Sequence, residues 1–352
     1  MIPIEVVDRG GRRATFVVEE GQRLLHAGLM AGIGLPHECA TGTCGNCKAS
    51  VVAGDALHLW PAAPGAKVCR RPGDVLLCQT AARSPLELAL PSAFIPPCQP
   101  SCSRKRGRLV STHMLTPEVG LFEVELSEPV AYKPGQFVLL SGLGVREPRA
   151  YSMTHHEPEE TRLRFLIRRS PGGGFTTRLF EASSGDEVDV FGPLGRATFD
   201  CDERRPFVGV AGGSGIAGIM SIIRHSLERD HFREHPSRLF FGLRDADGSY
   251  LLDDLADIVE RSGTRLRVTI VFSDAQCSPG LAAKTPLLDF RQGFVHDVAR
   301  ECLLKGEMPE LRDKHPPVFF VGGPPLMVNA TMRALISDCK ISPTEIRYDR
   351  FG

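Results

Sequence analysis

Four cysteines carry the strongest chemical signal in this chain of 352 residues. Cys39, Cys44 and Cys47 stand in the run Cys-Ala-Thr-Gly-Thr-Cys-Gly-Asn-Cys, and Cys78 follows in Leu-Leu-Cys-Gln. Iron–sulfur clusters take soft, anionic thiolate ligands, and C-x4-C-x2-C with a more distant fourth cysteine is a spacing that holds a [2Fe–2S] cluster. Because such a cluster carries one electron at a time, the spacing predicts an electron-transfer protein.

Two glycines between these cysteines favour the same interpretation. Gly42 and Gly45 have no side chain to block the approach of the backbone to a cluster, and glycine tolerates the positive φ angles of a tight loop. Backbone N–H groups there can also donate to an anionic cluster. Buried or disulfide-bonded cysteines are one alternative. Zinc is another, but its usual signature is two short C-x2-C pairs, and this segment has one.

The choice of the fourth ligand rests on the sequence around Cys78. Cys69 is its only rival, and the stretch 74–79 resembles the end of a plant-type ferredoxin closely, which favours Cys78. The other cysteines share no spacing and are predicted to be reduced core or surface thiols. They are Cys69, Cys98, Cys102, Cys201, Cys277, Cys302 and Cys339.

Composition excludes several classes of protein. The 42 Lys and Arg residues balance 42 Asp and Glu residues, which argues against nucleic-acid binding and against polybasic attachment to a membrane. No apolar run reaches the length of a membrane span. The segment 1–5 leads directly into a strand-like pattern, so no export signal is expected, and the spare cysteines predict a reducing cytoplasm.

The chain is predicted to hold three domains with elements that position these residues. Residues 1–92 contain a hairpin and a short helix at 24–30 before the cysteine loop, and residues 93–106 form a linker rich in proline and polar residues. Short strands with turns between them over 107–203 predict a small antiparallel barrel. Strands and helices alternate over 204–352, which predicts a parallel sheet covered on both faces.

Three further motifs follow one another in the predicted barrel. They are Arg-Ala-Tyr-Ser at 149–152, Pro-Gly-Gly-Gly-Phe-Thr at 171–176 and the segment 185–195. Taken in this order, they resemble the flavin-binding barrel of the ferredoxin–NADP⁺ reductase family. With the cysteine motif in front, the whole chain resembles the reductase components of bacterial oxygenases, such as those of benzoate dioxygenase, phenol hydroxylase and methane monooxygenase.

This resemblance implies a fold and a set of cofactors. The expected fold is a β-grasp ferredoxin-like domain, an antiparallel β-barrel FAD-binding domain and a doubly wound parallel α/β domain that binds NAD(P). The expected cofactors are a [2Fe–2S] cluster, FAD and NADH, and aromatic-compound catabolism is the expected setting. A flavin is needed because a nicotinamide gives two electrons as hydride and the cluster takes one.

The motifs also assign residues to the flavin. Arg149 offers a guanidinium fork to the FAD pyrophosphate. Tyr151 can stack on the isoalloxazine, Ser152 can hydrogen-bond near its N5, and the resemblance implies that Phe351 covers a flavin face. The remaining predicted FAD-binding residues are Gly173, Gly174 and Thr176 in the glycine turn.

The last domain is predicted to bind the nicotinamide dinucleotide. A turn of four residues stands between a strand and a helix, where backbone N–H groups can receive a pyrophosphate. The carboxylates of Asp245 and Asp247 would repel a 2′-phosphate, although Arg244 could bind one, so NADH is favoured over NADPH. The predicted nucleotide-binding residues are Gly212, Gly213 and Gly215 in this turn, with Gly323 and Pro324 in a second loop.

Three positions depart from the family pattern. Gly322 stands where the family usually has cysteine, Gly218 where it usually has proline, and His155 where a small polar residue is commoner. Two hypotheses therefore stay open. In the first, NADH reduces FAD, and the cluster then passes electrons to an oxygenase or a ferredoxin.

In the second hypothesis the nicotinamide step is lost. The protein would then be an electron carrier or redox sensor that a partner ferredoxin charges and that signals to a transcriptional regulator. Direct binding to DNA has no support in the sequence, because the charge is balanced and no reading-helix motif is evident.

Overall fold

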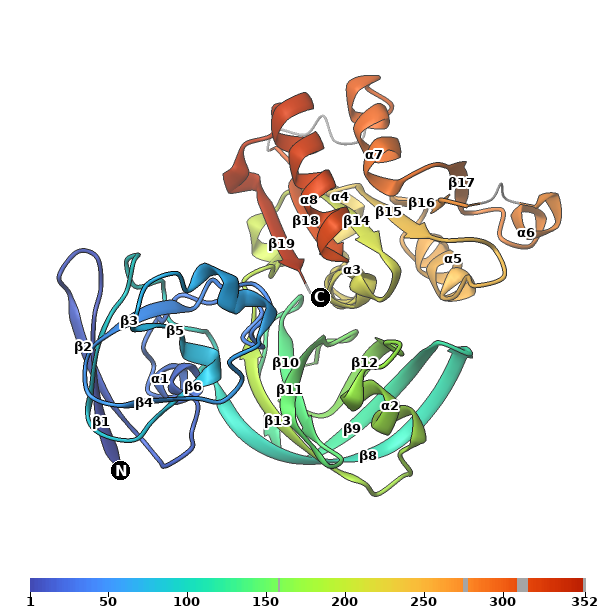
Figure 1. Ribbon diagram of the computed structural model, residues 1–352. Coiled ribbons are helices and arrows are strands. Elements are labelled where there is room, and N and C mark those ends of the chain that lie inside the picture. Colours follow the sequence, from blue (N-terminus) through green and yellow to red (C-terminus); the bar gives the residue numbers. More distant parts are fainter. Residues whose placement is uncertain (158, 275–277, 309–315, 351–352) are drawn as a thin grey trace. The chain divides into compact units, whose positions relative to one another are not determined.

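The computed structural model describes residues 1–157, 159–274, 278–308 and 316–350 (Figure 1). It divides into two compact units. One comprises residues 1–106, 138–150 and 189–194, and the other comprises residues 107–137, 151–188 and 195–352.

The first unit contains the β-grasp sheet that the resemblance implied. Five strands lie in the order β2-β1-β7-β3-β5, with β1 antiparallel to β2 and parallel to β7. Helix α1 packs six of its residues into the core of this domain. Its strands are β1 (Ile2–Val7), β2 (Arg13–Val18), β3 (Lys48–Ala53), β5 (Asp74–Leu76) and β7 (Leu86–Ala89). The other elements are α1 (Leu24–Met30), the pair β4 (Ala56–His58) and β6 (Thr80–Ala82), and the 3-10 helices η1 (Pro64–Val68) and η2 (Leu77–Gln79).

A second sheet forms the predicted antiparallel barrel. Its strand order is β11-β10-β13-β8-β9-β12, and an antiparallel bridge from Met153 to Phe165 joins the end of β11 to β12. The first strand, β8, begins at Ser103, within the segment predicted to be a linker. The elements are β8 (Ser103–Thr116), β9 (Val119–Val130), β10 (Phe137–Gly142), β11 (Val145–Ser152), β12 (Glu160–Arg168), α2 (Gly174–Glu181) and β13 (Glu187–Leu194).

The third sheet is parallel throughout, in the order β17-β16-β15-β14-β18-β19. Its strands are β14 (Phe207–Gly212), β15 (Ser237–Leu243), β16 (Leu266–Phe272), β17 (Asp289–Gln292), β18 (Val318–Gly323) and β19 (Ile346–Arg350). The helices are α3 (Ala217–Glu228), α4 (His231–Glu234), α5 (Leu252–Arg261), α6 (Pro279–Lys284), α7 (Val295–Leu304) and α8 (Pro325–Arg333), with the 3-10 helices η3 (Cys201–Glu203), η4 (Gly213–Ile216) and η7 (Pro343–Glu345) and the π-helix η6 (Ala334–Asp338).

Alternating side chains give this parallel sheet two cores. Helices α3 and α5 cover one face of the sheet, and α7 and α8 cover the other (Figure 1). Phe207 belongs to the core with α3 and α5, whereas the next residue, Val208, belongs to the core with α7 and α8. Successive residues of a strand point to opposite faces, so strands that are apolar throughout are buried on both sides. The predicted doubly wound domain is confirmed.

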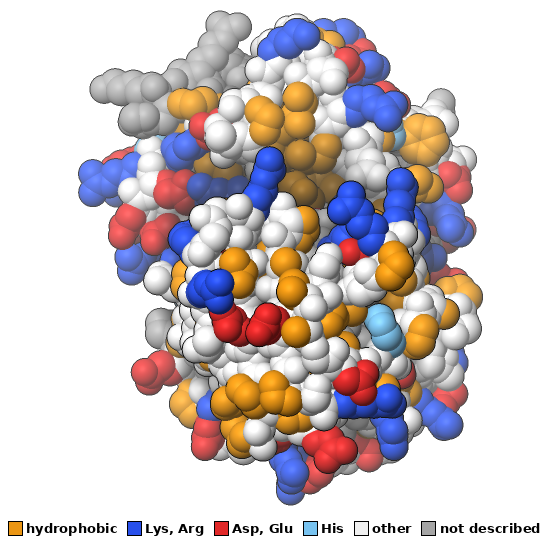
Figure 2. Space-filling view, turned by 60° about the vertical axis from the view of Figure 1, so that its left-hand side comes forward, with side chains coloured by type: hydrophobic (Ala, Val, Ile, Leu, Met, Phe, Trp, Pro, Cys, Tyr) orange, Lys and Arg blue, Asp and Glu red, His pale blue; other side chains and the backbone are white. Residues whose placement is uncertain are grey.

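The surface carries both charges. On the face shown in Figure 2, Lys and Arg side chains are interspersed with Asp and Glu side chains, as the balanced composition leads one to expect. Within the described ranges, none of the helices has both the length and the apolar character that crossing a bilayer requires.

Candidate functional site

The four predicted cluster ligands lie together in two pairs. The Sγ atoms of Cys39 and Cys44 are 3.2 Å apart, and so are those of Cys47 and Cys78. The backbone N–H of Leu77 donates to the carbonyl of Cys47, which holds the fourth-ligand segment against the loop. A [2Fe–2S] cluster needs two thiolates for each iron, so this donor set fits it. We call the loop 39–47 together with Cys78 the cluster cradle.

Backbone donors in the cradle prepare it for an anionic group. The N–H groups of Thr41 and Cys44 point at Cys39 Sγ, at 3.5 and 3.4 Å. Hydrogen bonds with the Cys44 thiol and with Thr43 and Thr41 lower the pKa of the Cys39 thiol to about 4. Gly42 and Gly45 have φ angles of +90° and +84°, the left-handed conformation that the sequence predicted for them.

Arg23 supports the cradle and was not recognised from the sequence. It precedes α1, and its Nη1 donates to the carbonyl of Cys78 at 2.8 Å and to Gln79 Oε1 at 2.6 Å. Gln79 in turn covers Gly42, because a Cβ at Gly42 would lie 2.9 Å from the Gln79 side chain. Burial lowers the pKa of the Arg23 guanidinium, with the neighbouring Cys78 acting in the opposite direction. No motif marks such a contact, which joins residues far apart in the chain.

The flavin motif begins in the first unit with Arg149. Its guanidinium lies over the Trp60 ring, 5.9 Å from the ring centroid, and its Nη1 donates to the carbonyls of Pro148 and Glu147 at 3.1 and 3.4 Å. Arg149 is thus held at the edge of the iron–sulfur domain, and its contact with a pyrophosphate stays a prediction.

The second unit brings the next two parts of the flavin motif together. The Tyr151 ring lies 5.9 Å from the ring of Phe175, which belongs to the glycine turn and α2. Thr176 is buried, and its hydroxyl accepts from the N–H of Ser170 at 3.1 Å and closes the turn of Gly173 and Gly174. The N–H groups that begin α2 remain available to a phosphate. Phe351 lies outside the described residues.

Ser152 is buried beside the two glycines that depart from the family pattern. A Cβ at Gly218 would lie 3.4 Å from Ser152 Cβ, so α3 packs closely against the flavin motif. A Cβ at Gly322 would lie 2.4 Å from the carbonyl oxygen of Gly215. Any side chain at 322 would displace the nucleotide turn, so the missing cysteine has a steric explanation. The third departure is His155, whose Nδ1 is within hydrogen-bonding distance of the Thr154 hydroxyl and the Arg224 guanidinium. Burial lowers its pKa to about 3.

A large pocket lies at the carboxyl ends of the parallel strands. Its volume is about 850 Å³, and Gly212, Gly213 and Pro324 of the two predicted nucleotide loops line it. Gly215 and Gly323 lie directly behind, since a Cβ at Gly215 would be 2.3 Å from Gly323 Cα. The pocket is large enough for a dinucleotide. All five predicted nucleotide-binding residues therefore meet at one place.

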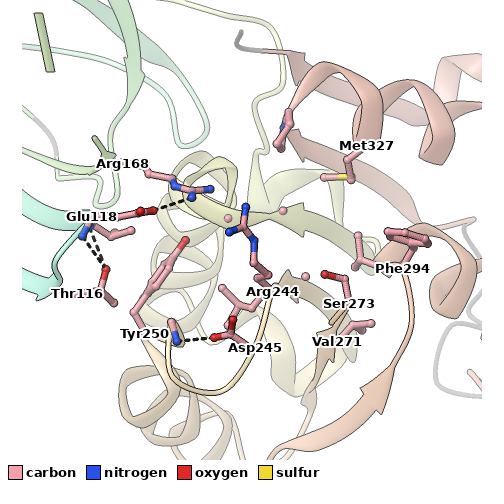
Figure 3. A pocket seen from close by; sticks show the side chains of 18 of the residues that line it. Thr116, Glu118, Arg168, Arg244, Asp245, Tyr250, Val271, Ser273, Phe294 and Met327 are labelled. Carbon is pink, nitrogen blue, oxygen red and sulfur yellow. Dashed lines mark hydrogen bonds and ion pairs between the residues drawn. The ribbon is translucent and has the colours of Figure 1, made fainter. Parts of the chain in front are cut away.

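Charged groups line the mouth of this pocket (Figure 3). Arg168 pairs with Glu118 at 2.7 Å on the barrel side. Asp245 accepts from the N–H of Gly248 at 2.7 Å, and Arg244 lies 3.9 Å from Asp274. The predicted specificity residues Arg244, Asp245 and Asp247 all line the pocket.

Tyr250 is a lining residue that the sequence did not reveal. The residue is 7% exposed, and its buried hydroxyl has no hydrogen-bond partner among the residues that the structure describes. That hydroxyl would be 3.8 Å from a Cβ at Gly213, so it lies beside the nucleotide turn. Burial raises its pKa, which keeps the hydroxyl protonated and able to donate. A buried, unpaired donor beside a phosphate-type loop is suited to an oxygen of the dinucleotide.

Comparison with known proteins assigns the chain to a family. The ferredoxin–NAD(+) reductase component of the alkene monooxygenase system of Xanthobacter autotrophicus is 32% identical over 340 residues, which are 96% of this chain and 98% of that protein. The chain belongs to the iron–sulfur flavoprotein reductases of the ferredoxin–NAD(P)⁺ reductase family. Residues 7–83 match the 2Fe-2S iron-sulfur cluster binding domain, 106–199 the oxidoreductase FAD-binding domain and 210–333 the oxidoreductase NAD-binding domain.

Other relatives agree over the full length. The reductase subunit of an aromatic O-demethylase from Amycolatopsis is 32% identical, covering 98% of each chain. Among solved structures, the ferredoxin reductase in carbazole 1,9a-dioxygenase has a TM-score of 0.81 and 27% identity over 99% of this chain and 98% of that one. The predicted cofactors and activity are confirmed: this is an oxidoreductase with [2Fe–2S], FAD and NAD(P)H.

Proposed function

We propose that this protein is an NADH-dependent reductase that supplies single electrons to the oxygenase of a bacterial catabolic system, directly or through a ferredoxin. The acidic lining of the nucleotide pocket carries the preference for NADH. Asp245 and Asp247 follow β15, where the ribose of the adenosine half is expected, and a 2′-phosphate would meet their charge. Two of the relatives named above belong to oxygenase systems, those of the alkene monooxygenase and of carbazole 1,9a-dioxygenase, which supports the choice of partner.

The chain's own residues have distinct parts in this proposal. The nucleotide turn and Tyr250 hold the dinucleotide, and Ser152, buried at 8% exposure, offers a hydroxyl to the flavin ring while Tyr151 flanks it. When bound, the flavin accepts two electrons and releases them one at a time. The cradle, with its N–H donors and Arg23, keeps the four thiolates and the acceptor-facing loop in place. We place the protein in the cytoplasm, where its thiols stay reduced.

An anaerobic titration tests this proposal. The reconstituted protein should lose its flavin and cluster absorption with NADH. The kcat/KM for NADPH should be about tenfold lower, because the half-buried Asp245 and the exposed Asp247 would repel the 2′-phosphate by about 1 kcal/mol. The double variant Asp245→Ser with Asp247→Ser should bring the kcat/KM values for NADH and NADPH closer together. Equal rates with both nucleotides in the unaltered protein would contradict the assignment to NADH.

The sensor hypothesis rests on Gly322 and Gly218, and neither now favours it. A Cβ at Gly322 would meet the Gly215 backbone, and one at Gly218 would lie 3.4 Å from Ser152 Cβ, so packing accounts for both positions. The two relatives named above by their organism are reductases. The same titration decides it. Bleaching by dithionite, with none by NADH or NADPH, would favour the sensor over the reductase.

A further inference from the structure

A basic surface borders the cluster cradle. Lys67, Arg70 and Arg71 are exposed, and they belong to η1 and the turn that follows it. We call these three residues the basic rim. None of them forms an ion pair within the part of the chain that the structure describes, unlike Arg168 of β12 and Arg238 of β15.

The rim is attached directly to the loop that holds the cluster. The N–H of Gly65 donates to the carbonyl of Gly42 at 2.8 Å. A Cβ at Gly45 would lie 3.0 Å from a methyl group of Val68, so η1 and the cradle are in close contact. The exposed side chain of Asn46 and the half-buried Cys44 bring the cradle to the surface. Charges on the rim therefore act at the point where a protein acceptor must approach.

The carboxylate nearest in sequence does not neutralise the rim. Asp74 is buried, and its carboxylate pairs with Lys48 at 2.7 Å. It also accepts from the backbone N–H groups of Arg70 and Arg71, each at 3.0 Å, and these bonds turn the backbone inward while leaving both guanidiniums outside. Glu38, on the other side of the loop, is hydrogen-bonded to Asn46. The exposed side of η1 thus keeps its positive charge.

We propose that the basic rim is a docking surface for an acidic patch around the redox centre of the electron acceptor. The inference rests on the proposed function, since it requires that a protein takes electrons from the cluster. Complementary charges steer encounters and raise association rates by about 10- to 1,000-fold at low salt. The effect should fade as ionic strength rises, because the Debye length is only about 8–10 Å near 0.1–0.15 M.

A single acceptor protein, prepared once with a positive and once with a negative surface, gives a direct test. Native cytochrome c has a lysine-rich surface, and succinylation converts those lysines to carboxylates around the same haem. The reconstituted full-length protein, reduced with NADH, is mixed with each form at low and high ionic strength. We expect the succinylated form to be reduced faster at low salt and this advantage to disappear at high salt.

Matched charge reversals separate the rim from overall charge. Arg70→Glu with Arg71→Glu should lower the ratio of the succinylated to the native rate by at least about tenfold. Arg9→Glu with Arg83→Glu reverses the same charge at exposed positions of the same domain, and Arg83 has only a long, exposed pair with Asp55 at 3.9 Å. This control should leave the ratio near its original value. All four side chains are exposed, so both variants should fold.

Two outcomes would overturn the docking surface. They are an equal change of the ratio in both double variants and no change in the rim variant. Failure of the proposed function looks different, because NADH would then leave the flavin unbleached. In that case the same mixing experiment, run on protein reduced with dithionite, still tests the rim.

Discussion

The cluster cradle and the nucleotide pocket bind their groups in opposite ways. The cradle takes three of its four ligands from one loop, residues 39–47, and its donors are backbone N–H groups of that loop. The pocket is assembled from the ends of β14, β15, β16 and β18, with Glu118 and Arg168 added from the barrel. A site that one loop forms can be recognised from consecutive residues. A site at the edge of a sheet depends on how distant parts of the chain fold together.

Glycine also serves the two regions differently. In the cradle, Gly42 and Gly45 have positive φ angles. In the nucleotide region, Gly215 and Gly322 allow two loops to touch, because a Cβ on either would overlap the other loop's backbone. We therefore expect substitutions in the cradle to affect the cluster alone, and those in the nucleotide loops to affect the fold as well.

The largest effect should come from the cradle. Cys78→Ser removes a ligand from the pair with Cys47, so the reconstituted protein should fall from about two iron atoms per chain to nearly none. Flavin bleaching by NADH should persist, because the nucleotide pocket is a separate site. Iron analysis and visible spectra measure both. Cys69→Ser is the control, and if it lost the cluster while Cys78→Ser kept it, the ligand assignment would be wrong.

The next effect concerns the nucleotide loops. Gly322→Cys, which recreates the family's usual residue, should destabilise the protein by about 1–3 kcal/mol, because its Cβ would meet the carbonyl of Gly215 at 2.4 Å. Thermal unfolding followed by circular dichroism measures the loss. Gly280→Ala, at a position with open space around it, should cost nothing. A gain in both stability and NADH turnover for Gly322→Cys would show that the loops do not pack as described.

A smaller change should follow loss of the cation behind the cradle. Arg23→Gln removes a positive charge beside Cys78 and should lower the midpoint potential of the cluster by roughly 60 mV, a tenfold change for one electron. Arg23→Lys keeps the charge and should lie between this variant and the original protein. A redox titration followed by electron paramagnetic resonance gives these potentials. Identical potentials for all three proteins would assign Arg23 a purely mechanical role.

Tyr250 offers the corresponding test in the pocket. Tyr250→Phe removes the unpaired hydroxyl, so the Kd for NADH should rise about fivefold, the equivalent of one hydrogen bond of about 1 kcal/mol. The nucleotide-free protein should be no less stable, because a buried donor without a partner has been removed. Fluorescence titration and thermal unfolding separate the two effects. Equal losses of affinity and stability would mean that the hydroxyl supports the fold and does not bind NADH.

The smallest effect is a shared pH dependence. His26 in the first unit is buried and His155 in the second is half-buried, and loss of hydration lowers the pKa of each to about 3. Below the unfolded pKa of 6.5 the unfolded chain binds protons that the folded chain does not, so stability should fall as the pH drops from 6.5 towards 3.

At pH 6 each histidine should cost less than about 1 kcal/mol. His26→Gln or His155→Gln should reduce the change of the unfolding free energy with pH when urea unfolding is measured from pH 7 to 5. A slope unchanged in either variant would contradict the low pKa of that histidine.

The sequence predicted what depends on local pattern and missed what depends on folding. The cluster cysteines, the helix at 24–30 and the strand, turn and helix over 207–225 follow from spacing and periodicity. The structure contains all three, with the last helix, α3, extending to Glu228. Arg23 and Tyr250 lie beside residues that are far away in the chain, Cys78 and Gly213, so no spacing could reveal them. From the sequence alone, Gly322 predicts a weakened nicotinamide site, because its contact with the Gly215 backbone exists only in the folded chain.

The order of electron arrival tests the central claim most directly. The fully reconstituted protein is mixed anaerobically with NADH in a stopped-flow instrument, and parallel samples are frozen for electron paramagnetic resonance. Flavin absorption should fall first, and the signal of the reduced cluster should rise after it. In Cys78→Ser the first phase should remain and the cluster signal should be absent. A cluster signal that NADH never produces, although dithionite does, would contradict the proposed path from nucleotide pocket to cradle.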